Sequence, residues 1–239
     1  MKALASDTAM VMAAGMGKRM RPLTASQPKP LVRVAGKPLI DHALDRLGDA
    51  GIARAVVNVH YMADALEAHV MERAAPRVTI SDERDHLLET GGGLVKAQSA
   101  LPDPFFCLNA DNIWLDGPKN AFADLSARWD PDEMDALLLL VSHTRACNFS
   151  GQGDFTMDAG GQLSRRKPGR IAPFIYTGIQ LVSHRLLRDA PQGAFSTNVL
   201  WNRAIEEGRL FGVSFTGLWF EVGTPHAIAP TERALEHGQ

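Results

Sequence analysis

The sequence from Ala9 to Leu31 reads AMVMAAGMGKRMRPLTASQPKPL. It begins with an apolar run of strand length, Ala9 to Ala14, which ends abruptly at Gly15 and Gly17. Glycine allows positive φ angles and a close approach of the backbone to a ligand, so that successive N–H groups can face one anion. The pattern predicts a strand that runs into an anion-binding loop.

Cations surround this loop in the sequence. Lys18, Arg19 and Arg21 follow the glycines, and Lys29 lies between two prolines. A proline pushes the residue before it out of the α region. We therefore expect Lys29 to lie on a stiff, non-helical arm.

A glycine pair after a strand is common in α/β proteins and by itself points only weakly to a phosphate site. The stretch is not the P-loop motif, and it is not G-x-G-x-x-G, because Met20 occupies the third glycine position. It matches L-A-A-G-x-G-x-R-[ML]-x-P-L-T followed by P-K-P-L, with Met12 in place of the usual leucine. The chain thus resembles the sugar-1-phosphate nucleotidyltransferases.

The composition is that of an ordinary globular protein. The 239 residues suffice for one α/β domain, with 45% hydrophobic and 22% charged residues. A formal charge of -2 gives no general reason to bind nucleic acid or membrane, and no apolar run has membrane-spanning length. Cys107 and Cys147 lack the spacing of a zinc site, and Cys107 lies in an apolar run as a small core residue would. We expect a protein of the reducing cytoplasm.

Strands and helices alternate along the first part of the chain. An amphipathic helix that begins at Leu39 and closes at Gly51 is followed by a strand, Arg54 to His60, a helix, Met62 to Ala74, and a strand, Arg77 to Asp82. This alternation predicts a parallel sheet covered on both faces. Further strands are expected at Phe105–Asn112, Ala136–Ser142, Phe174–Val182, Leu210–Phe215 and Leu218–Gly223, and further helices at Asn120–Trp129, Asn198–Gly208 and from Thr224 onward.

The stretch from Leu88 to Ala97, LETGGGLVKA, carries three consecutive glycines, which we expect just before a helix. They could serve only as a flexible helix start. They could also let a flat nucleobase lie against bare peptide groups. The resemblance favours the second interpretation, because the family has the same ETGGG motif at the base.

Two acids follow apolar strands. Asp111 comes at the carboxyl end of the Phe105–Asn112 strand, where ligands collect in open α/β sheets, and its hard oxygens suit Mg²⁺. Glu221 lies between two apolar residues in LWFEVG. The resemblance assigns metal binding to both positions, with Glu221 one methylene longer than the aspartate of the family.

The second half contains a predicted hairpin from Gly151 to Gly161 and a strand with Thr177 and Gly178 in its middle. The strand element resembles the [ST]-G-I of the family's sugar pocket. Between them lie Arg165, Arg166, Lys167 and Arg170. These four cations could form a solvated loop or could clamp an acidic sugar or its phosphate.

The resemblance implies a Rossmann-like, mostly parallel α/β sheet flanked by helices, with an inserted β-rich sugar-binding subdomain. We expect one nucleotidyltransferase domain over residues 1–239, with a nucleotide-binding core at about 1–145 and a sugar-binding part that also completes the core at 146–239. The implied site residues are Arg19, Lys29 and Asp111 for catalysis; Ala13, Ala14, Gly15, Met16, Gly17, Thr90, Gly91, Gly92 and Gly93 for the nucleotide; Asn109, Gly153, Thr177 and Gly178 for the sugar; and Asp111 and Glu221 for Mg²⁺.

Within the family, the sequence is most similar to the short N-acetylmuramate 1-phosphate uridylyltransferases of peptidoglycan recycling. It shares with them PKPLVxVAGxPLI, the ETGGG loop and the G-x-GDF hairpin at Gly151–Phe155. UTP and a sugar 1-phosphate are then the expected partners. The alternatives are a mannose or glucose 1-phosphate nucleotidyltransferase that uses GTP, dTTP or UTP, and a catalytically weak regulatory relative that binds sugar nucleotides.

Overall fold

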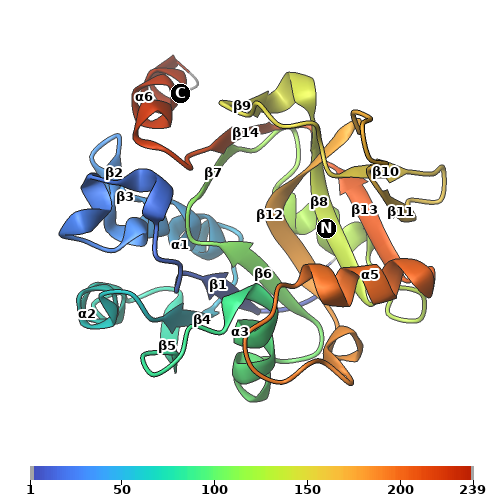
Figure 1. The fold of residues 1–239 in the computed structure, drawn as a ribbon, viewed down its shortest axis with the longest axis horizontal. Coiled ribbons are helices and arrows are strands. Elements are labelled where there is room, and N and C mark those ends of the chain that lie inside the picture. Colours follow the sequence, from blue (N-terminus) through green and yellow to red (C-terminus); the bar gives the residue numbers. More distant parts are fainter. Residues whose placement is uncertain (1–2, 238–239) are drawn as a thin grey trace.

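The computed structural model describes residues 3–237 and has one large sheet at its centre (Figure 1). Four parallel strands lie side by side in the order β5 (Arg77–Asp82), β4 (Arg54–Val59), β1 (Thr8–Met12) and β6 (Phe105–Asn109). The chain moves outward from β1 through β4 to β5 and then returns to the other side of β1. The carboxyl ends of β1 and β6 therefore form a topological switch point, where ligands bind in sheets of this kind.

The second half of the chain completes this sheet. The long strand β12 (Phe174–Val182) pairs antiparallel with β6 on one side and with β8 (Ala136–Ser142) on the other, and β13 (Leu210–Ser214) pairs parallel with β8. The hairpin of β10 (Phe155–Met157) and β11 (Leu163–Arg165) joins β12 through Phe155 and Phe174. The predicted mostly parallel α/β sheet is confirmed, and the hairpin extends it instead of forming a separate sheet.

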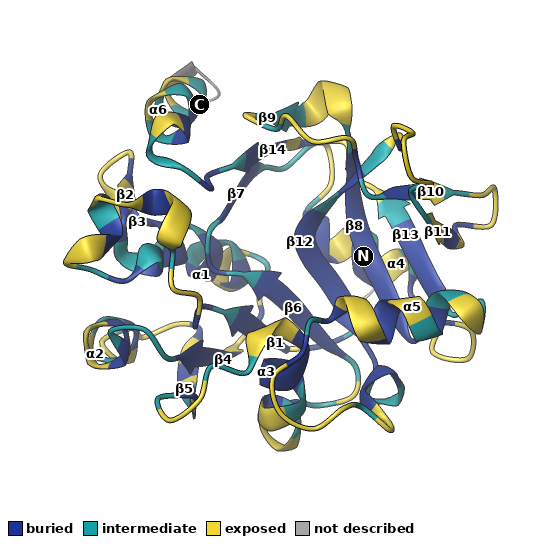
Figure 2. Ribbon diagram, in the orientation of Figure 1, coloured by how far each residue is buried: buried dark blue, intermediate teal, exposed yellow. Residues whose placement is uncertain are grey.

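Alternate side chains of the strands point into two cores on opposite faces. One core packs against α1 (Leu39–Asp49), α2 (Ala63–Met71) and α4 (Ala121–Arg128), and the other against α3 (Glu89–Ala97) and α5 (Asn198–Glu206). Successive residues of one strand belong to different cores; for example, Phe106 packs in the first core and Cys107 in the second. Figure 2 shows the central strands as a continuous buried layer beneath partly exposed helices.

A small second sheet lies beside the carboxyl ends of the main strands. It consists of β7 (Asn112–Leu115), β14 (Leu218–Glu221) and β9 (Ala146–Cys147), near the short hairpin β2 (Arg33–Val34)–β3 (Lys37–Pro38) and α6 (Ile228–His237). A third core, which includes Met20, Ile113 and Phe220, joins this sheet to the glycine loop. The single strand predicted at Phe105–Asn112 is thus two strands in different sheets, separated by a turn at Ala110 and Asp111.

Other predicted details differ from the structure. The three glycines lie inside α3 instead of before it. The helix predicted from Thr224 onward starts as a 3-10 turn, Pro225–Ala227, and continues as α6. No helix within the described part of the chain is both long and apolar enough to cross a membrane.

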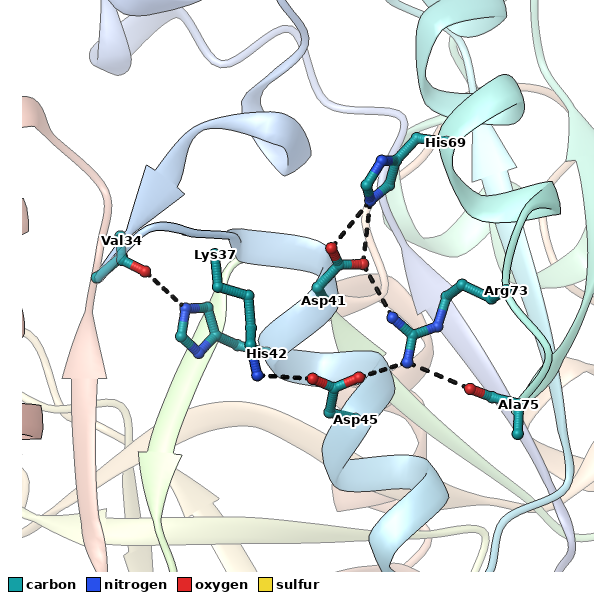
Figure 3. A network of polar contacts seen from close by, with 8 residues as sticks. All are labelled: Val34, Lys37, Asp41, His42, Asp45, His69, Arg73 and Ala75. Atoms are coloured by element: carbon teal, nitrogen blue, oxygen red, sulfur yellow. Dashed lines mark hydrogen bonds and ion pairs between the residues drawn. The ribbon is translucent and has the colours of Figure 1, made fainter. Parts of the chain in front are cut away.

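A network of charged side chains fastens α1 to α2 (Figure 3). Asp41 on α1 accepts hydrogen bonds from His69 Nε2 at 3.0 Å and from Arg73 at 3.1 Å, and Asp45 accepts from Arg73 and, at 2.7 Å, from Lys37. Burial raises the pKa of Asp45, but the hydrogen bonds from Lys37 and Arg73 outweigh it and hold the pKa below its usual range. Both helices are thereby fixed on the face of the sheet away from α3.

Candidate active site

The glycine loop is anchored by a buried asparagine on the neighbouring strand. Asn58 of β4 is 2% exposed, and its Oδ1 accepts hydrogen bonds from the backbone N–H groups of Ala13, at 2.6 Å, and Ala14, at 3.3 Å. Asn58 Nδ2 in turn donates to Glu83 Oε1 at 2.7 Å. The start of the loop is therefore positioned by side chains and not by the strand alone.

Glu83 is the second member of this anchor. It is only 1% exposed, and its Oε2 accepts a hydrogen bond from Leu88 N at 3.0 Å, at the start of α3. Glu83 is thus a buried anchor, although it begins the charged stretch ERDH that follows β5. Neither Asn58 nor Glu83 was predicted to belong to the site; the available signal was one asparagine inside the apolar strand RAVVNVH.

The loop itself packs directly on Lys29. Gly17 has a φ of +58°, and a Cβ added there would lie 2.8 Å from Lys29 Cβ. The carbonyl of Gly17 accepts a hydrogen bond from Thr24 Oγ1 at 2.9 Å. Glycine is needed at this position both for its backbone angle and because the loop and the lysine approach so closely.

Lys29 begins a 3-10 turn, Lys29–Leu31, so the expectation of a non-helical arm is wrong for this residue. Only Pro28 before it is extended. The Lys29 side chain is 14% exposed, and its ammonium group forms an ion pair with Asp111 Oδ2. The lysine thus joins the glycine loop to the carboxyl end of β6.

The small sheet brings the second acid to the same place. Glu221 ends β14 and pairs in register with Asn112, the residue that follows Asp111. Arg19 lies 3.7 Å from Glu221, and its side chain is 72% exposed. A Cβ on Gly223 would lie 3.1 Å from the Arg19 guanidinium, so glycine at that position leaves room for the arginine.

The two carboxylates fit a hard divalent cation that is completed by substrate. Asp111 and Glu221 are each about one-third exposed, and both line one pocket. Within residues 3–237, no group of three or more His, Cys, Asp or Glu side chains is placed to hold a metal ion by itself. Two carboxylates with open positions suit Mg²⁺, which usually takes one or two protein carboxylates and fills its shell with water and phosphate oxygens.

Three pockets meet at Asp111. The central pocket, about 420 Å³, is lined by Ala13, Ala14, Gly15, Lys29, Thr90 and Asn109 among others. The loop pocket lies along Gly15 to Arg19, and the strand pocket is lined by Asn109, Asn112, Thr177, Gly178 and Glu221. The structure thereby brings together most of the residues predicted for the nucleotide, the sugar and the metal.

The triple glycine of α3 is explained by packing. A Cβ on Gly91 would lie 2.3 Å from the Phe195 ring, one on Gly92 would lie 2.4 Å from the carbonyl oxygen of Gly193, and one on Gly93 would lie 2.9 Å from Glu83. All three glycines are buried, whereas Thr90 lines the central pocket. Side chains at these three positions would therefore prevent the close packing of the helix on its neighbours. A contact of the glycines with a nucleobase stays a prediction.

Gly178 creates a bulge in β12 that is covered by two carboxamides. Its φ is +82°, and a Cβ there would lie 2.6 Å from Asn109 Nδ2 and 2.7 Å from Asn112 Nδ2. Asn112 is 3% exposed, and its Nδ2 has no hydrogen-bond partner among the described residues. Asn112, which also lines the strand pocket, was not predicted as a site residue. The Thr177 hydroxyl is occupied, because it donates to the Leu139 carbonyl at 2.9 Å.

Gly153 serves a tight turn. Its φ is +77°, and a Cβ would lie 2.2 Å from the Ala172 carbonyl oxygen. Gly153 does not line the strand pocket, but the next residue, Asp154, does. Asp154 Oδ2 accepts a hydrogen bond from Tyr176 N at 2.9 Å, so it also holds the hairpin against β12.

The four cations of the hairpin region do not converge on one point. Arg165 stacks over Phe155 and donates to Asn198 and Asn202 of α5. Arg166 donates to the Gly153 carbonyl and holds the turn, while Lys167 and Arg170 are exposed. Only Arg165 is directed toward a helix that borders a pocket.

Similarities to known proteins agree with this geometry. Residues 8–152 match the family described as nucleotidyl transferase. A protein from Caulobacter vibrioides named N-acetylmuramate alpha-1-phosphate uridylyltransferase is 46% identical, with 97% of this chain and 98% of its own length covered. A protein of the same name from Neisseria meningitidis serogroup B is 34% identical, with 90% and 93% covered. The solved structure of the inositol-1-phosphate CTP transferase from T. maritima has the same fold, with a TM-score of 0.77 at 16% identity and with 97% of this chain and 96% of its own covered.

Proposed function

Because this chain belongs to the nucleotidyl transferase family, we propose that it transfers UMP from UTP to N-acetylmuramate α-1-phosphate and releases pyrophosphate. The observation that carries the proposal is the meeting of Lys29, Asp111 and Glu221 beside the glycine loop. These residues supply one cation for a phosphate group and two carboxylates for a metal ion, side by side.

The chemistry asks for little acid or base catalysis. A phosphate oxygen of the sugar is already an anion and attacks the α-phosphorus in line, so the protein must bring two repelling anions together and neutralise the leaving pyrophosphate. Bound Mg²⁺ would supply positive charge at the reacting phosphates, held by Asp111 and Glu221. Lys29 would contact the α-phosphate and the incoming sugar phosphate. Arg19 would contact the β- and γ-phosphates.

Each of the two cations forms an ion pair with one of the two acids assigned to the metal ion. Lys29 is paired with Asp111, and Arg19 with Glu221. A bound triphosphate and its metal ion would attract these side chains more strongly than the side chains attract each other. The phosphates would attract the two cations, and the metal ion would attract the two carboxylates. The ion pairs hold the four side chains close to where they would contact phosphate and metal, and they leave none of these charges without a partner.

The remaining predicted residues divide between the substrates. We assign Ala13 to Gly17 and the Thr90–Gly93 segment to the nucleotide, and Asn109, Gly153, Thr177 and Gly178 to the sugar. To the sugar site we add Asn112, because its buried Nδ2 donor lacks a partner within the described structure. On this assignment residues 1–145 supply the nucleotide site together with Asn109 and Asn112 of the sugar site, and residues 146–239 supply the rest of the sugar site and complete the core.

The names of the two bacterial relatives support uridine as the base and N-acetylmuramate as the sugar. We place the reaction in the cytoplasm, in peptidoglycan recycling. Two free cysteines agree with a reducing compartment, and burial raises the pKa of Cys107 to about 12, so this thiol is an inert core group.

The test is pyrophosphate release by the purified protein with each of UTP, GTP and dTTP, combined with the 1-phosphates of N-acetylmuramate, N-acetylglucosamine, mannose and glucose. The expected result is the highest kcat/KM for UTP with N-acetylmuramate 1-phosphate. A preference for GTP or dTTP with mannose or glucose 1-phosphate would replace the proposed substrates. Binding of sugar nucleotide without turnover would indicate a regulatory protein.

A further inference from the structure

A fourth pocket adjoins the sites assigned above. The side pocket, about 250 Å³, lies between β6, β12, α3 and α5 and is lined by Asn109, Tyr176, Gln180, Ser196, Asn198 and Trp201 among others. It shares Asn109 with both the central and the strand pocket, and it shares Tyr176 with the strand pocket. A substituent of a sugar bound at this junction can therefore extend into it.

The side pocket differs from the strand pocket in charge. Three acids, Asp111, Asp154 and Glu221, line the strand pocket, whereas no acidic or basic side chain is among the residues lining the side pocket. Burial raises the pKa of the Tyr176 phenol well above its usual value, so the hydroxyl stays a neutral donor. Arg19 also lines the strand pocket, which therefore carries charges of both signs, whereas the side pocket presents only neutral polar groups to a substituent.

The rim of the side pocket presents oriented donors. Asn198 Oδ1 accepts a hydrogen bond from Arg165 at 2.9 Å, and Asn198 Nδ2 donates one to Ser196 Oγ at 3.1 Å, which leaves its second N–H and the Ser196 hydroxyl as donors. The hydrogen bond from Arg165 identifies Oδ1 as the acceptor end of the Asn198 carboxamide and Nδ2 as its donor end. Both Asn198 and Ser196 line the side pocket.

Arg165 supplies a positive charge that forms no ion pair among the described residues; burial lowers the pKa of its guanidinium, and the nearby charge of Asp154 partly offsets this. It is half-buried, stacked over the rings of Phe155, at 4.9 Å, and Trp201, at 5.6 Å, and its hydrogen bonds go to the neutral groups of Asn198 and Asn202. Within residues 3–237 it has no ion-pair partner among Asp and Glu. A partly desolvated guanidinium of this kind gains from an anion placed nearby.

On the basis of the proposed function, we propose that the side pocket accepts the lactyl carboxylate by which N-acetylmuramate differs from N-acetylglucosamine. Arg165 is then a positioning and specificity residue, which acts through Asn198 and through its charge. The class of substrate is an amino sugar 1-phosphate that carries a carboxylate. The other three cations of the hairpin region have no part in this recognition.

The experiment compares Arg165→Met with the wild type. Methionine retains an unbranched apolar stem for packing on Phe155 but removes the charge and the donors. Arg165→Lys, which keeps the charge, tests for rescue. The matched control is Arg128→Met, because Arg128 also stacks over a ring, that of Phe211 at 5.6 Å, and donates to a neutral carbonyl on a part of the sheet away from the pocket.

Each variant is assayed with three acceptors: N-acetylmuramate 1-phosphate, its lactyl amide and N-acetylglucosamine 1-phosphate. For a partly exposed contact we expect Arg165→Met to lower kcat/KM for the acid about fivefold, with the amide and glucosamine substrates unchanged. Arg165→Lys should restore part of the preference, and Arg128→Met should keep all of it. The affinity for the acid, measured by titration calorimetry without UTP, should fall by the same factor.

The outcomes separate the two proposals. Wild-type protein that transfers no UMP to N-acetylmuramate 1-phosphate would overturn the proposed function. Wild-type protein that does so, with acid-to-amide ratios unchanged in Arg165→Met, would overturn only the assignment of the side pocket. An equal loss of kcat/KM for all three acceptors would show that Arg165 only supports the fold. This result would also overturn the assignment of the side pocket.

Discussion

Replacing Asn58 by alanine tests whether the Asn58–Glu83 anchor positions the glycine loop. The change removes the acceptor of the Ala13 and Ala14 N–H groups and the donor to Glu83 Oε1. All of these groups lie in the buried interior at the carboxyl ends of β1, β4 and β5. Each buried polar group without a partner costs about 1 kcal/mol or more. Three such groups give an expected loss of about 3 kcal/mol in the free energy of unfolding.

For a domain of this size, a loss of that magnitude corresponds to a fall in Tm of about 6 to 12 °C. Asn58 also lines the central pocket, so kcat/KM for UTP should fall together with stability. The measurements are urea and thermal unfolding by circular dichroism and steady-state kinetics below the Tm of the variant. A double-mutant cycle with Glu83→Gln should show that the two residues are coupled, because they share a hydrogen bond.

Asn120→Ala is the matched control. Asn120 also accepts hydrogen bonds from two backbone N–H groups, those of Phe122 and Ala123, but it does so at the solvent-facing start of α4. Its loss should cost about 1 kcal/mol and leave kcat/KM unchanged. If Asn58→Ala cost no more than Asn120→Ala, or left kcat/KM for UTP intact, the loop would be held by its own backbone and the reasoning would be wrong.

Three further predictions concern single residues. Asp111→Asn should abolish turnover while leaving Tm within a few degrees, because a metal ligand is lost and not core volume; near wild-type rates at limiting Mg²⁺ would exclude this role. Lys29→Met should cost about 3 kcal/mol in the transition state, seen in kcat more than in the KM for UTP; a change in that KM alone would make Lys29 a binding residue. Burial lowers the pKa of His42, which is then protonated more readily in the unfolded chain, so the free energy of unfolding should decrease as pH falls from about 7 to 5. His42→Gln should flatten this slope, as urea unfolding at each pH would measure, and an unchanged slope would contradict the assignment.

The order of strands and helices could be predicted from the sequence because each depends on local periodicity. The apolar runs of β1, β4 and β8 and the amphipathic pattern of α1 are read within a window of a few residues, and Gly51, with a φ of +84°, ends α1 as expected. The resemblance of Met12 to Thr24 to a family motif also depends only on consecutive residues. These predictions are confirmed where the structure tests them.

The pairing of distant residues was decided by the tertiary structure. Asp111 and Glu221 lie 110 positions apart in the sequence and become neighbours because β7 and β14 pair in register. No local pattern encodes that pairing, and the sequence alone placed Asp111 at the end of one long strand. The break between β6 and β7 exists because the two segments pack in different sheets.

The sequence by itself therefore determined the residue types of the candidate site, namely glycines for close approach, cations for phosphate and carboxylates for a metal ion. The tertiary structure decided which of these groups act together and which are occupied elsewhere. Asn58 belongs to the site through its hydrogen bond with Glu83, 25 positions away in the chain. Arg165 differs from the other cations of the hairpin region through its hydrogen bond with Asn198, 33 positions away. Side-chain chemistry is a property of each residue, whereas burial and pairing depend on elements that meet only in the folded chain.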